Sequence, residues 1–196
     1  MKLSKLKILA TLGAAAFLMG ATSGQTITVK GSDTMVIMAQ RWAESYMAKH
    51  PGTSIQVTGG GSGTGISALI NGTTDICNAS RPMKSAERAK LQDRYATLGV
   101  EIKSAKDGLS VYVHESSPVK ELSVDQLRDI YLGKTTNWNQ LGGPDKKIIV
   151  YGRENNSGTY AFFKDHVLKG KDYVANMQSM PGTAAVVNAV SKDVNG

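Results

Sequence analysis

Three segments of the chain place glycine beside serine or threonine where an extended stretch gives way to a helical pattern. They are Gly31-Ser32-Asp33-Thr34, residues 59–65 and residues 153–159. A helix start leaves backbone N–H groups unpaired and carries partial positive charge, so it attracts anions. Glycine lets the backbone approach a ligand closely, and a hydroxyl adds a donor that can turn toward an oxygen. Several such junctions in one α/β chain predict a site for a small tetrahedral oxyanion above strand ends.

Two arginines lie in or beside these junctions. A fourth, less regular junction holds Ser80 and Arg81, and the third begins with Arg153, four residues before Ser157. A guanidinium matches two oxygens of an oxyanion at once, which favours a binding role for Arg153. The alternative stays open that the serines merely cap their helices and that Arg153 is an ordinary surface residue.

Other kinds of site do not fit the residues present. The glycine-rich segment 59–65 lacks the lysine of a nucleotide-binding loop and does not have dinucleotide-binding spacing. His50, His114 and His166 are far apart and show no metal-ligand spacing. No serine elbow with a partnered histidine indicates a hydrolase. We therefore expect no metal, no cofactor and no enzymatic activity.

The N-terminus has the order of a secretory signal. Three lysines in the first seven residues precede the mostly apolar run 8–19 and the small and polar stretch 20–24, so residues 1–24 are predicted to be removed. A membrane anchor is the alternative, but a span needs about 20 apolar residues. No cysteine follows the run to accept lipid, which indicates a free periplasmic protein. The single cysteine, Cys77, excludes an intramolecular disulfide and is expected to be a small buried hydrophobe.

The charge of the chain does not indicate a nucleic-acid partner. The formal charge of +7 falls to +4 when the three lysines of the signal are removed. The remaining basic residues are scattered and form no basic run interleaved with aromatic residues, so they are best interpreted as a solvated surface. We expect a monomer.

Strand and helix patterns alternate along the chain, which predicts an α/β fold. Strands are expected at residues 26–30, 54–58, 75–78 and 147–151, and extended segments at 100–104 and 109–114. Helices are expected at residues 35–49, from the glycine-rich loop to Asn71-Gly72, from an N-cap at Ser85 to about residue 97, at 124–132 between the cap Ser123 and Gly133, at 158–168 and at 183–190. The crossing between two units is expected between the two extended segments.

At the same junctions the sequence resembles the phosphate substrate-binding proteins of ATP-driven transporters, in the branch with shorter chains. The resemblance covers nearly all of the chain after the signal, and the last motif is the most specific. The motifs are Gly31 to Met35, Thr58 to Gly65, Asp75 to Met83, Ile130 to Lys134, Asn137-Trp138 and Gly152 to Tyr160.

The resemblance implies a two-lobed α/β fold of the periplasmic-binding-protein type II class that closes on inorganic phosphate and delivers it to the permease subunits of an ABC transporter. The first lobe would comprise residues 25–105 and be incomplete, and the second would comprise residues 106–196. The candidate phosphate-binding residues are Ser32, Asp33, Thr34, Met35, Ser62, Thr64, Ser80 and Arg81 from the first lobe and Arg153, Ser157, Gly158 and Thr159 from the second.

Three departures from the family pattern bear on the site. Asn155 stands where an aspartate often steadies the arginine, so Arg153 is expected to be held less firmly. Ser80 stands where well-known members have an acidic residue that accepts the hydrogen of phosphate and so rejects sulfate. Asp33 or Glu154 could supply that acceptor instead, and our hypothesis is that Asp33 does. The chain also stops where family members continue, so a C-terminally truncated chain is expected.

Several alternatives remain open from the sequence. The ligand could be another oxyanion, such as sulfate or molybdate. The chain could be a phosphate-sensing or interaction module without a transport role, or an exported phosphate-releasing enzyme, although no nucleophile with a base is evident.

Overall fold

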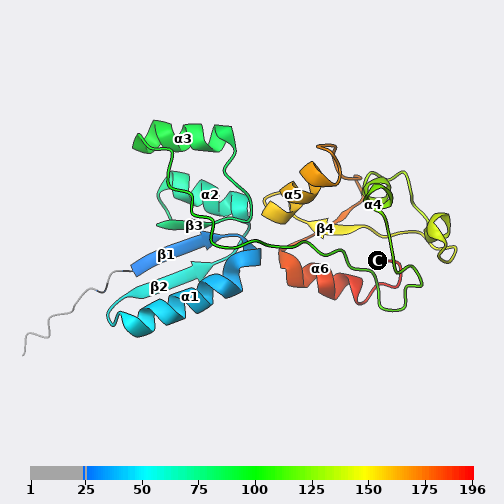
Figure 1. Ribbon diagram of the computed structural model, residues 1–196, viewed down its shortest axis with the longest axis horizontal. Helices are drawn as coiled ribbons and strands as arrows, with labels where there is room; N and C mark the ends of the chain where they lie inside the picture. The colour runs from blue at the N-terminus through cyan, green and yellow to red at the C-terminus, as the bar shows by residue number, and fades with distance from the viewer. Residues whose placement is uncertain (1–23, 25) are drawn as a thin grey trace, which may run out of the picture.

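The computed structural model describes Gly24 and residues 26–196, which form two lobes of mixed α/β structure (Figure 1). The predicted signal lies outside the described residues except for Gly24. Elements up to residue 95 build the first lobe, and elements from residue 124 onward build the second. Within the described ranges, none of the helices has the length and apolarity needed to cross a membrane.

The first lobe is built on three parallel strands in the order β2-β1-β3. Their bounds are Ser54–Thr58 for β2, Thr26–Gly31 for β1 and Ile76–Asn78 for β3. Because the strands are parallel, their carboxyl ends lie at one edge of the sheet, and the loops that follow all three begin there. Three of the four predicted junctions are therefore brought to one edge by the topology.

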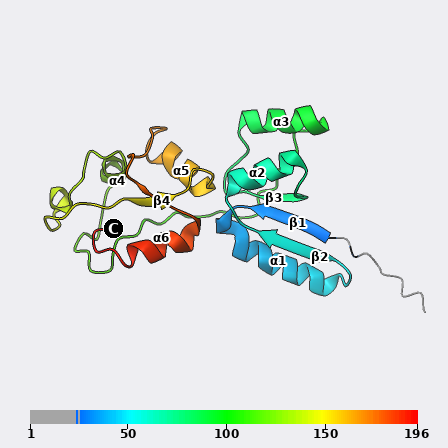
Figure 2. The same ribbon diagram turned by 180° about the vertical axis from the view of Figure 1, so that it is seen from behind.

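Helices cover both sides of this sheet (Figures 1 and 2). The short helix η1 (Asp33–Met35) runs into α1 (Val36–Lys49) on one side, and α2 (Ser62–Asn71) lies on the other, as right-handed crossovers require. Helix α3 (Ser85–Tyr95) packs outside α2. A methyl group at Gly65 would lie 2.5 Å from Gly31 Cα, so glycine is what lets α2 lie this close to β1.

The second lobe has two parallel strands, β4 (Tyr151–Arg153) and β5 (Gln178–Met180), between α5 (Gly158–His166) and α6 (Gly182–Val190) (Figures 1 and 2). Helix α4 (Val124–Tyr131) and the short helix η2 (Trp138–Leu141) lie at the far end of the lobe. The buried core there is formed by Val119, Ile130, Trp138 and Ile148.

A long segment without helix or strand joins the two lobes (Figure 1). The extended segments predicted at 100–104 and 109–114 lie in it, but neither is a strand. Within the described part of the chain, no backbone hydrogen bond joins residues 100–113 to another segment, so these residues have no sheet neighbour. The lobe boundary at residues 105/106 falls in this segment and stays a prediction.

Most of the other predicted elements are confirmed, with three corrections. The strand predicted at 147–151 is wrong in position, because its pairing partner β5 begins at Gln178 and so pairs only from Tyr151 onward. Strand β5 itself was not predicted. The N-cap of α3 is Lys84 and not Ser85, since the Lys84 N–H donates to Glu87 Oε2 at 2.7 Å and fixes the first turn one residue earlier.

Candidate functional site

The carboxyl edge of the first lobe's sheet faces the start of α5 in the second lobe (Figure 1). Three serines from separate junctions are almost fully buried there: Ser32 is 2% exposed, Ser62 is 0% exposed and Ser157 is 2% exposed. Hydroxyl groups are rarely buried in this way unless they have partners. The partners of these serines therefore define the site.

Ser80 links two of these serines through its side chain. Ser32 Oγ donates to Ser80 Oγ at 3.0 Å, and Ser80 Oγ lies 3.2 Å from Ser62 Oγ. The Ser80 N–H also donates to Ser62 Oγ at 3.0 Å. We call Ser32, Ser62 and Ser80 the serine cluster. It gathers hydroxyls from three strand ends of the first lobe.

Helix α5 approaches the serine cluster through its first residue. A methyl group at Gly158 would lie 2.2 Å from Ser80 Oγ and 2.7 Å from Ser62 Oγ. Ser157 accepts hydrogen bonds from the N–H groups of Thr159 and Tyr160, so it caps α5 as one interpretation of the sequence predicted. The start of α5 therefore abuts the hydroxyls with no space for a side chain between them.

Further contacts between the lobes surround this point. The Gly63 N–H donates to Asn156 O at 2.9 Å, and the Asn156 side chain donates to Gly60 O and Thr64 Oγ1 at 3.1 and 3.3 Å. The hydroxyls of Thr34 and Thr159 lie 3.4 Å apart. Asn156 was not singled out from the sequence, although it lies within the most specific motif. These contacts hold the start of α2 against the loop before α5.

Arg153 reaches across from the end of β4. It is 7% exposed; its Nη2 donates to Asp33 Oδ2 at 2.7 Å and its Nη1 donates to Thr183 Oγ1 at 3.1 Å. The other carboxylate oxygen of Asp33 accepts the Gly60 N–H at 2.8 Å. Arg153 Nε is buried and has no hydrogen-bond partner among the described residues. A buried donor without an acceptor is costly, so this nitrogen calls for an additional oxygen.

The expectation that Arg153 is held loosely is not met. Asn155 makes no hydrogen bond to Arg153 in the described part of the chain and instead borders a surface hollow beside Glu154. Asp33 from the opposite lobe and Thr183 from α6 hold the guanidinium. Thr183 lies 30 residues after Arg153 in the sequence, and no local pattern around Thr183 indicates that it contacts the guanidinium.

Arg81 is close to the serine cluster but is paired within its own lobe. Its Nη1 and Nη2 donate to the two oxygens of Glu87 at 2.8 and 2.7 Å, and Nη1 also donates to Pro82 O. These bonds raise the pKa of Arg81 and lower the pKa of Glu87. Glu87 in turn accepts the Lys84 N–H at the start of α3. The Arg81 guanidinium is thus tied to the fold of the first lobe.

Met35 is the remaining candidate for the site, and Cys77 is the residue for which only a structural role was predicted. Met35 ends η1, next to Thr34, and its N–H donates to Ser32 O at 3.1 Å. Cys77 is half-buried, and burial raises the pKa of its thiol to about 11, so the thiolate is disfavoured at neutral pH. Cys77 fits the structural role predicted for it.

Nucleophilic or metal chemistry finds little support in the described ranges. No group of three or more metal-ligating side chains occurs there. The histidines contact other groups: His50 stacks on Tyr46, the His114 ring hydrogen-bonds Ser116, and the His166 ring lies against Phe162. None of these contacts involves a serine of the site, so in the described ranges no hydroxyl there is paired with a histidine.

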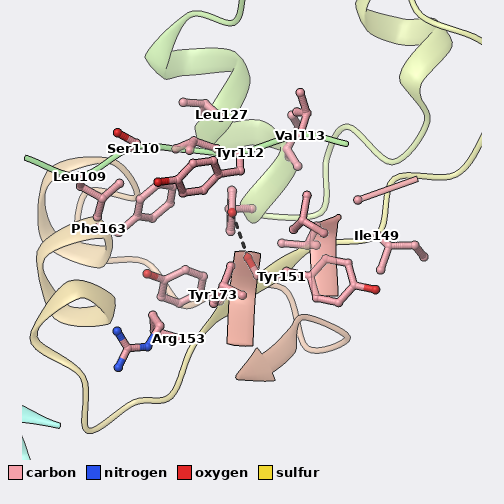
Figure 3. Close-up of a pocket in the computed structure, with 18 of the residues that line it drawn as sticks. Leu109, Ser110, Tyr112, Val113, Leu127, Ile149, Tyr151, Arg153, Phe163 and Tyr173 are labelled. Carbon is pink, nitrogen blue, oxygen red and sulfur yellow. Dashed lines mark hydrogen bonds between the residues drawn. The ribbon is translucent and has the colours of Figure 1, made fainter. Parts of the chain in front are cut away.

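A cavity of about 130 Å³ lies in the second lobe, and Arg153, Thr159 and Thr183 are among the residues that line it. Figure 3 shows aliphatic and aromatic side chains gathered between the segment 109–113 and β4, with Arg153 at one end. Tyr131 donates from its hydroxyl to Tyr151 O at 3.0 Å, and burial raises the pKa of Tyr131 to about 12. The lining is mostly apolar, so the cavity does not resemble an anion site.

Comparison with known proteins agrees with the arrangement of the lobes. A family model described as a PBP superfamily domain matches residues 19–196. The phosphate-binding protein PstS of Pseudomonas aeruginosa is 33% identical over 178 residues, which are 85% of this chain and 55% of the relative. PstS of Staphylococcus haemolyticus is 35% identical over 170 residues, 85% of this chain and 53% of the relative. The chain thus spans about half the length of the curated relatives that it matches.

Two solved structures share the fold over most of the chain. A candidate phosphate ABC transporter substrate-binding protein from Clostridium perfringens, crystallised with bound phosphate, matches with a TM-score of 0.78 and 32% identity over 87% of this chain and 68% of that one. An ABC-type phosphate transport receptor from Vibrio cholerae matches with a TM-score of 0.62 and 30% identity over 87% of this chain and 69% of that one.

Proposed function

Because the chain belongs to the PBP superfamily, we propose that it captures inorganic phosphate between its two lobes outside the cytoplasmic membrane and delivers it to the permease of an ABC transporter. The similar proteins named above are phosphate-binding proteins and receptors, two of them of ABC transporters by name. Periplasmic location, the permease partner and the monomeric state are parts of this proposal.

The observation that carries the proposal is the unpartnered donor at the junction of the lobes. Arg153 Nε is buried without an acceptor among the described residues, in a side chain whose Nη2 donates across the lobes to Asp33. A phosphate oxygen would satisfy this nitrogen, and the positive ends of the helices would stabilise its charge. The proposed ligand groups are Ser32, Thr34, the Met35 backbone, Ser62, Thr64 and Ser80 from the first lobe, with Arg153, Ser157, Gly158 and Thr159 from the second.

The arrangement suits binding better than covalent catalysis. The Ser157 hydroxyl already accepts two backbone N–H groups, and the contacts of the histidines lie elsewhere. A serine nucleophile needs an adjacent base to lose its proton. Donors from two lobes that surround one small anion can bind and release it without changing it.

Isothermal titration with sodium phosphate tests the proposal. We expect saturable binding of one phosphate per chain with a dissociation constant of about micromolar strength, that is roughly 8 kcal/mol of binding free energy. Sodium chloride at the same ionic strength is the control, and it should give only heat of dilution. The absence of saturable heat up to millimolar phosphate would show that the proposal is wrong.

A further inference from the structure

The segment that joins the two lobes contains residues 102–108, which we call the joining stretch (Figure 1). Every residue of this stretch is exposed, and Ile102 is 81% exposed. Among the described residues, no hydrogen bond ties the joining stretch to another segment, and within it the Gly108 N–H donates to Asp107 Oδ1 at 2.8 Å. A backbone without such bonds opens at little cost in free energy.

The chain is anchored on both sides of the joining stretch. Before it, the Glu101 carboxylate pairs with Arg88 of α3 in the first lobe. After it, Leu109 lines the cavity of the second lobe, and the His114 N–H donates to Gly196 O at 3.3 Å. A cut in the joining stretch would therefore leave each new end attached to its own lobe.

Two lysines, Lys103 and Lys106, lie in the joining stretch. An endoprotease binds its substrate as an extended chain, so it cleaves where the backbone is exposed and free of other hydrogen bonds. Trypsin-like serine proteases recognise a lysine through a carboxylate in their first specificity pocket. In contrast, Lys90 lies within α3, and the Lys134 N–H donates to Asp129 O in the turn after α4.

We propose that the joining stretch is a processing site for a lysine-specific serine endoprotease, and that cleavage there switches off phosphate capture. One water molecule is added across the Lys103–Ser104 or the Lys106–Asp107 peptide bond. The first lobe gains a carboxylate and the second gains an amine, and no further reactant is needed. The effect on capture rests on the proposed function, whereas the cleavage site does not.

A single cut is enough to separate the lobes covalently. Elements up to residue 95 form the first lobe and those from residue 124 form the second, so the described chain crosses between the lobes once. The contacts across the site, such as Arg153 with Asp33, are not covalent. A short linker holds two parts at an effective concentration of about millimolar. After cleavage the lobes must instead meet by diffusion.

Limited digestion with trypsin, followed by mass spectrometry of the fragments, tests the cleavage site. We expect the first cut after residue 24 to fall at Lys103 or Lys106. The double variant Lys103→Gln/Lys106→Gln should slow the first cut at least about tenfold, since cleavage elsewhere requires local unfolding. Lys134→Gln is the matched control and should leave the rate unchanged. A first cut outside the joining stretch would overturn the inference.

Isothermal titration of the cut protein with sodium phosphate tests the switch. At micromolar protein, we expect affinity to fall at least about 100-fold relative to the uncut chain. The trypsin-treated double variant should bind phosphate as the untreated chain does. Unchanged affinity after complete cleavage would overturn the switch. If the uncut chain binds no phosphate, the proposed function fails and the switch with it, while the digestion still tests the cleavage site.

Discussion

Arg81 and Arg153 each donate to a carboxylate, but one pair lies within a lobe and the other joins two lobes. Arg81 and Glu87 both belong to the first lobe, six residues apart, and Glu87 also fixes the start of α3. Arg153 and Asp33 come from opposite lobes and are separated by 120 residues. The first pair can form whenever the first lobe is folded, whereas the second can form only when the lobes are together.

The two guanidinium groups also differ in which of their N–H donors have a hydrogen-bond partner. Both terminal nitrogens of Arg81 donate to Glu87, with a third bond to Pro82 O. Arg153 keeps a buried Nε without a partner in the described part of the chain. The same residue type in two strand–helix junctions thus supports the fold in one case and is proposed to support binding in the other. Of the two arginines named from the sequence, Arg153 is the one we propose as a ligand for phosphate.

The largest effect should come from removing the guanidinium of Arg153. We expect Arg153→Met to lower phosphate affinity by at least about 100-fold, because charge-assisted hydrogen bonds each contribute about 1.5–3 kcal/mol and a tenfold loss is about 1.4 kcal/mol. Arg81→Met should lower thermal stability and change affinity only a few-fold. Titration calorimetry and thermal unfolding of both variants provide the comparison.

A double variant controls for the carboxylate that Arg153→Met leaves without its partner. Combining Arg153→Met with Asp33→Asn removes both charges, so any loss of binding no longer reflects an unpaired buried carboxylate. We expect the double variant to bind phosphate as poorly as the single one. Equal losses of affinity in Arg81→Met and Arg153→Met would show that the proposed contrast between the two pairs is wrong.

A smaller effect is expected from preventing close approach of the lobes. Gly158→Ala places a methyl group 2.2 Å from Ser80 Oγ, so α5 must move away from the serine cluster. Overpacking of this kind costs about 1–3 kcal/mol, which corresponds to roughly a 5- to 150-fold loss of phosphate affinity. Alanine is a better helix former than glycine, so α5 itself should remain folded.

Gly108→Ala is the matched control for this substitution. A methyl group there meets nothing within 4 Å, and Gly108 lies in the segment that joins the lobes. Its phosphate affinity should equal that of the wild type. Solution scattering should show whether Gly158→Ala fails to become compact on adding phosphate. Unchanged affinity in Gly158→Ala would mean that the lobes do not meet at this point when the ligand is bound.

The features that depend on neighbouring residues, such as helix caps, could be predicted from the sequence. Ser123 and Ser157 each precede a helical pattern, and both side chains accept the N–H groups of the following turn. Arg153 and Asp33 belong to different lobes, and no periodic pattern in the sequence predicts that they form a pair. Strand β5 has only three residues and no alternating pattern, because it is defined by its partner β4 rather than by its own side chains.

The candidate site divides in the same way. The strand–glycine–helix junctions in the sequence predict Ser32 and Ser62 as candidate site residues, because the start of a helix attracts an anion. The sequence could not show that Ser80 lies between them, because that depends on the order of the strands in the sheet. It also could not show that Arg81 turns toward Glu87. Residue types were predictable, and their partners were not.

The smallest effect is expected in how the Arg81–Glu87 pair of the first lobe makes the stability of the fold depend on pH. The hydrogen bonds from Arg81 lower the pKa of Glu87 below its ordinary value of 4.5. A carboxyl whose pKa is lower in the folded state stabilises the fold fully above its unfolded pKa, and this contribution is lost as pH falls through the folded value. The wild type should therefore lose stability between about pH 5 and the lowered pKa of Glu87.

Glu87→Gln should remove that part of the pH dependence, because glutamine does not titrate. The variant should be less stable than the wild type at pH 7 by about 1 kcal/mol, since the pair is partly exposed, and the difference should shrink toward pH 3. Urea unfolding at several pH values measures it. Glu44→Gln removes the exposed pair with Arg41 as a control and should cost less at pH 7. A Glu87→Gln difference that stays constant with pH would mean that Arg81 does not stabilise the ionised carboxylate.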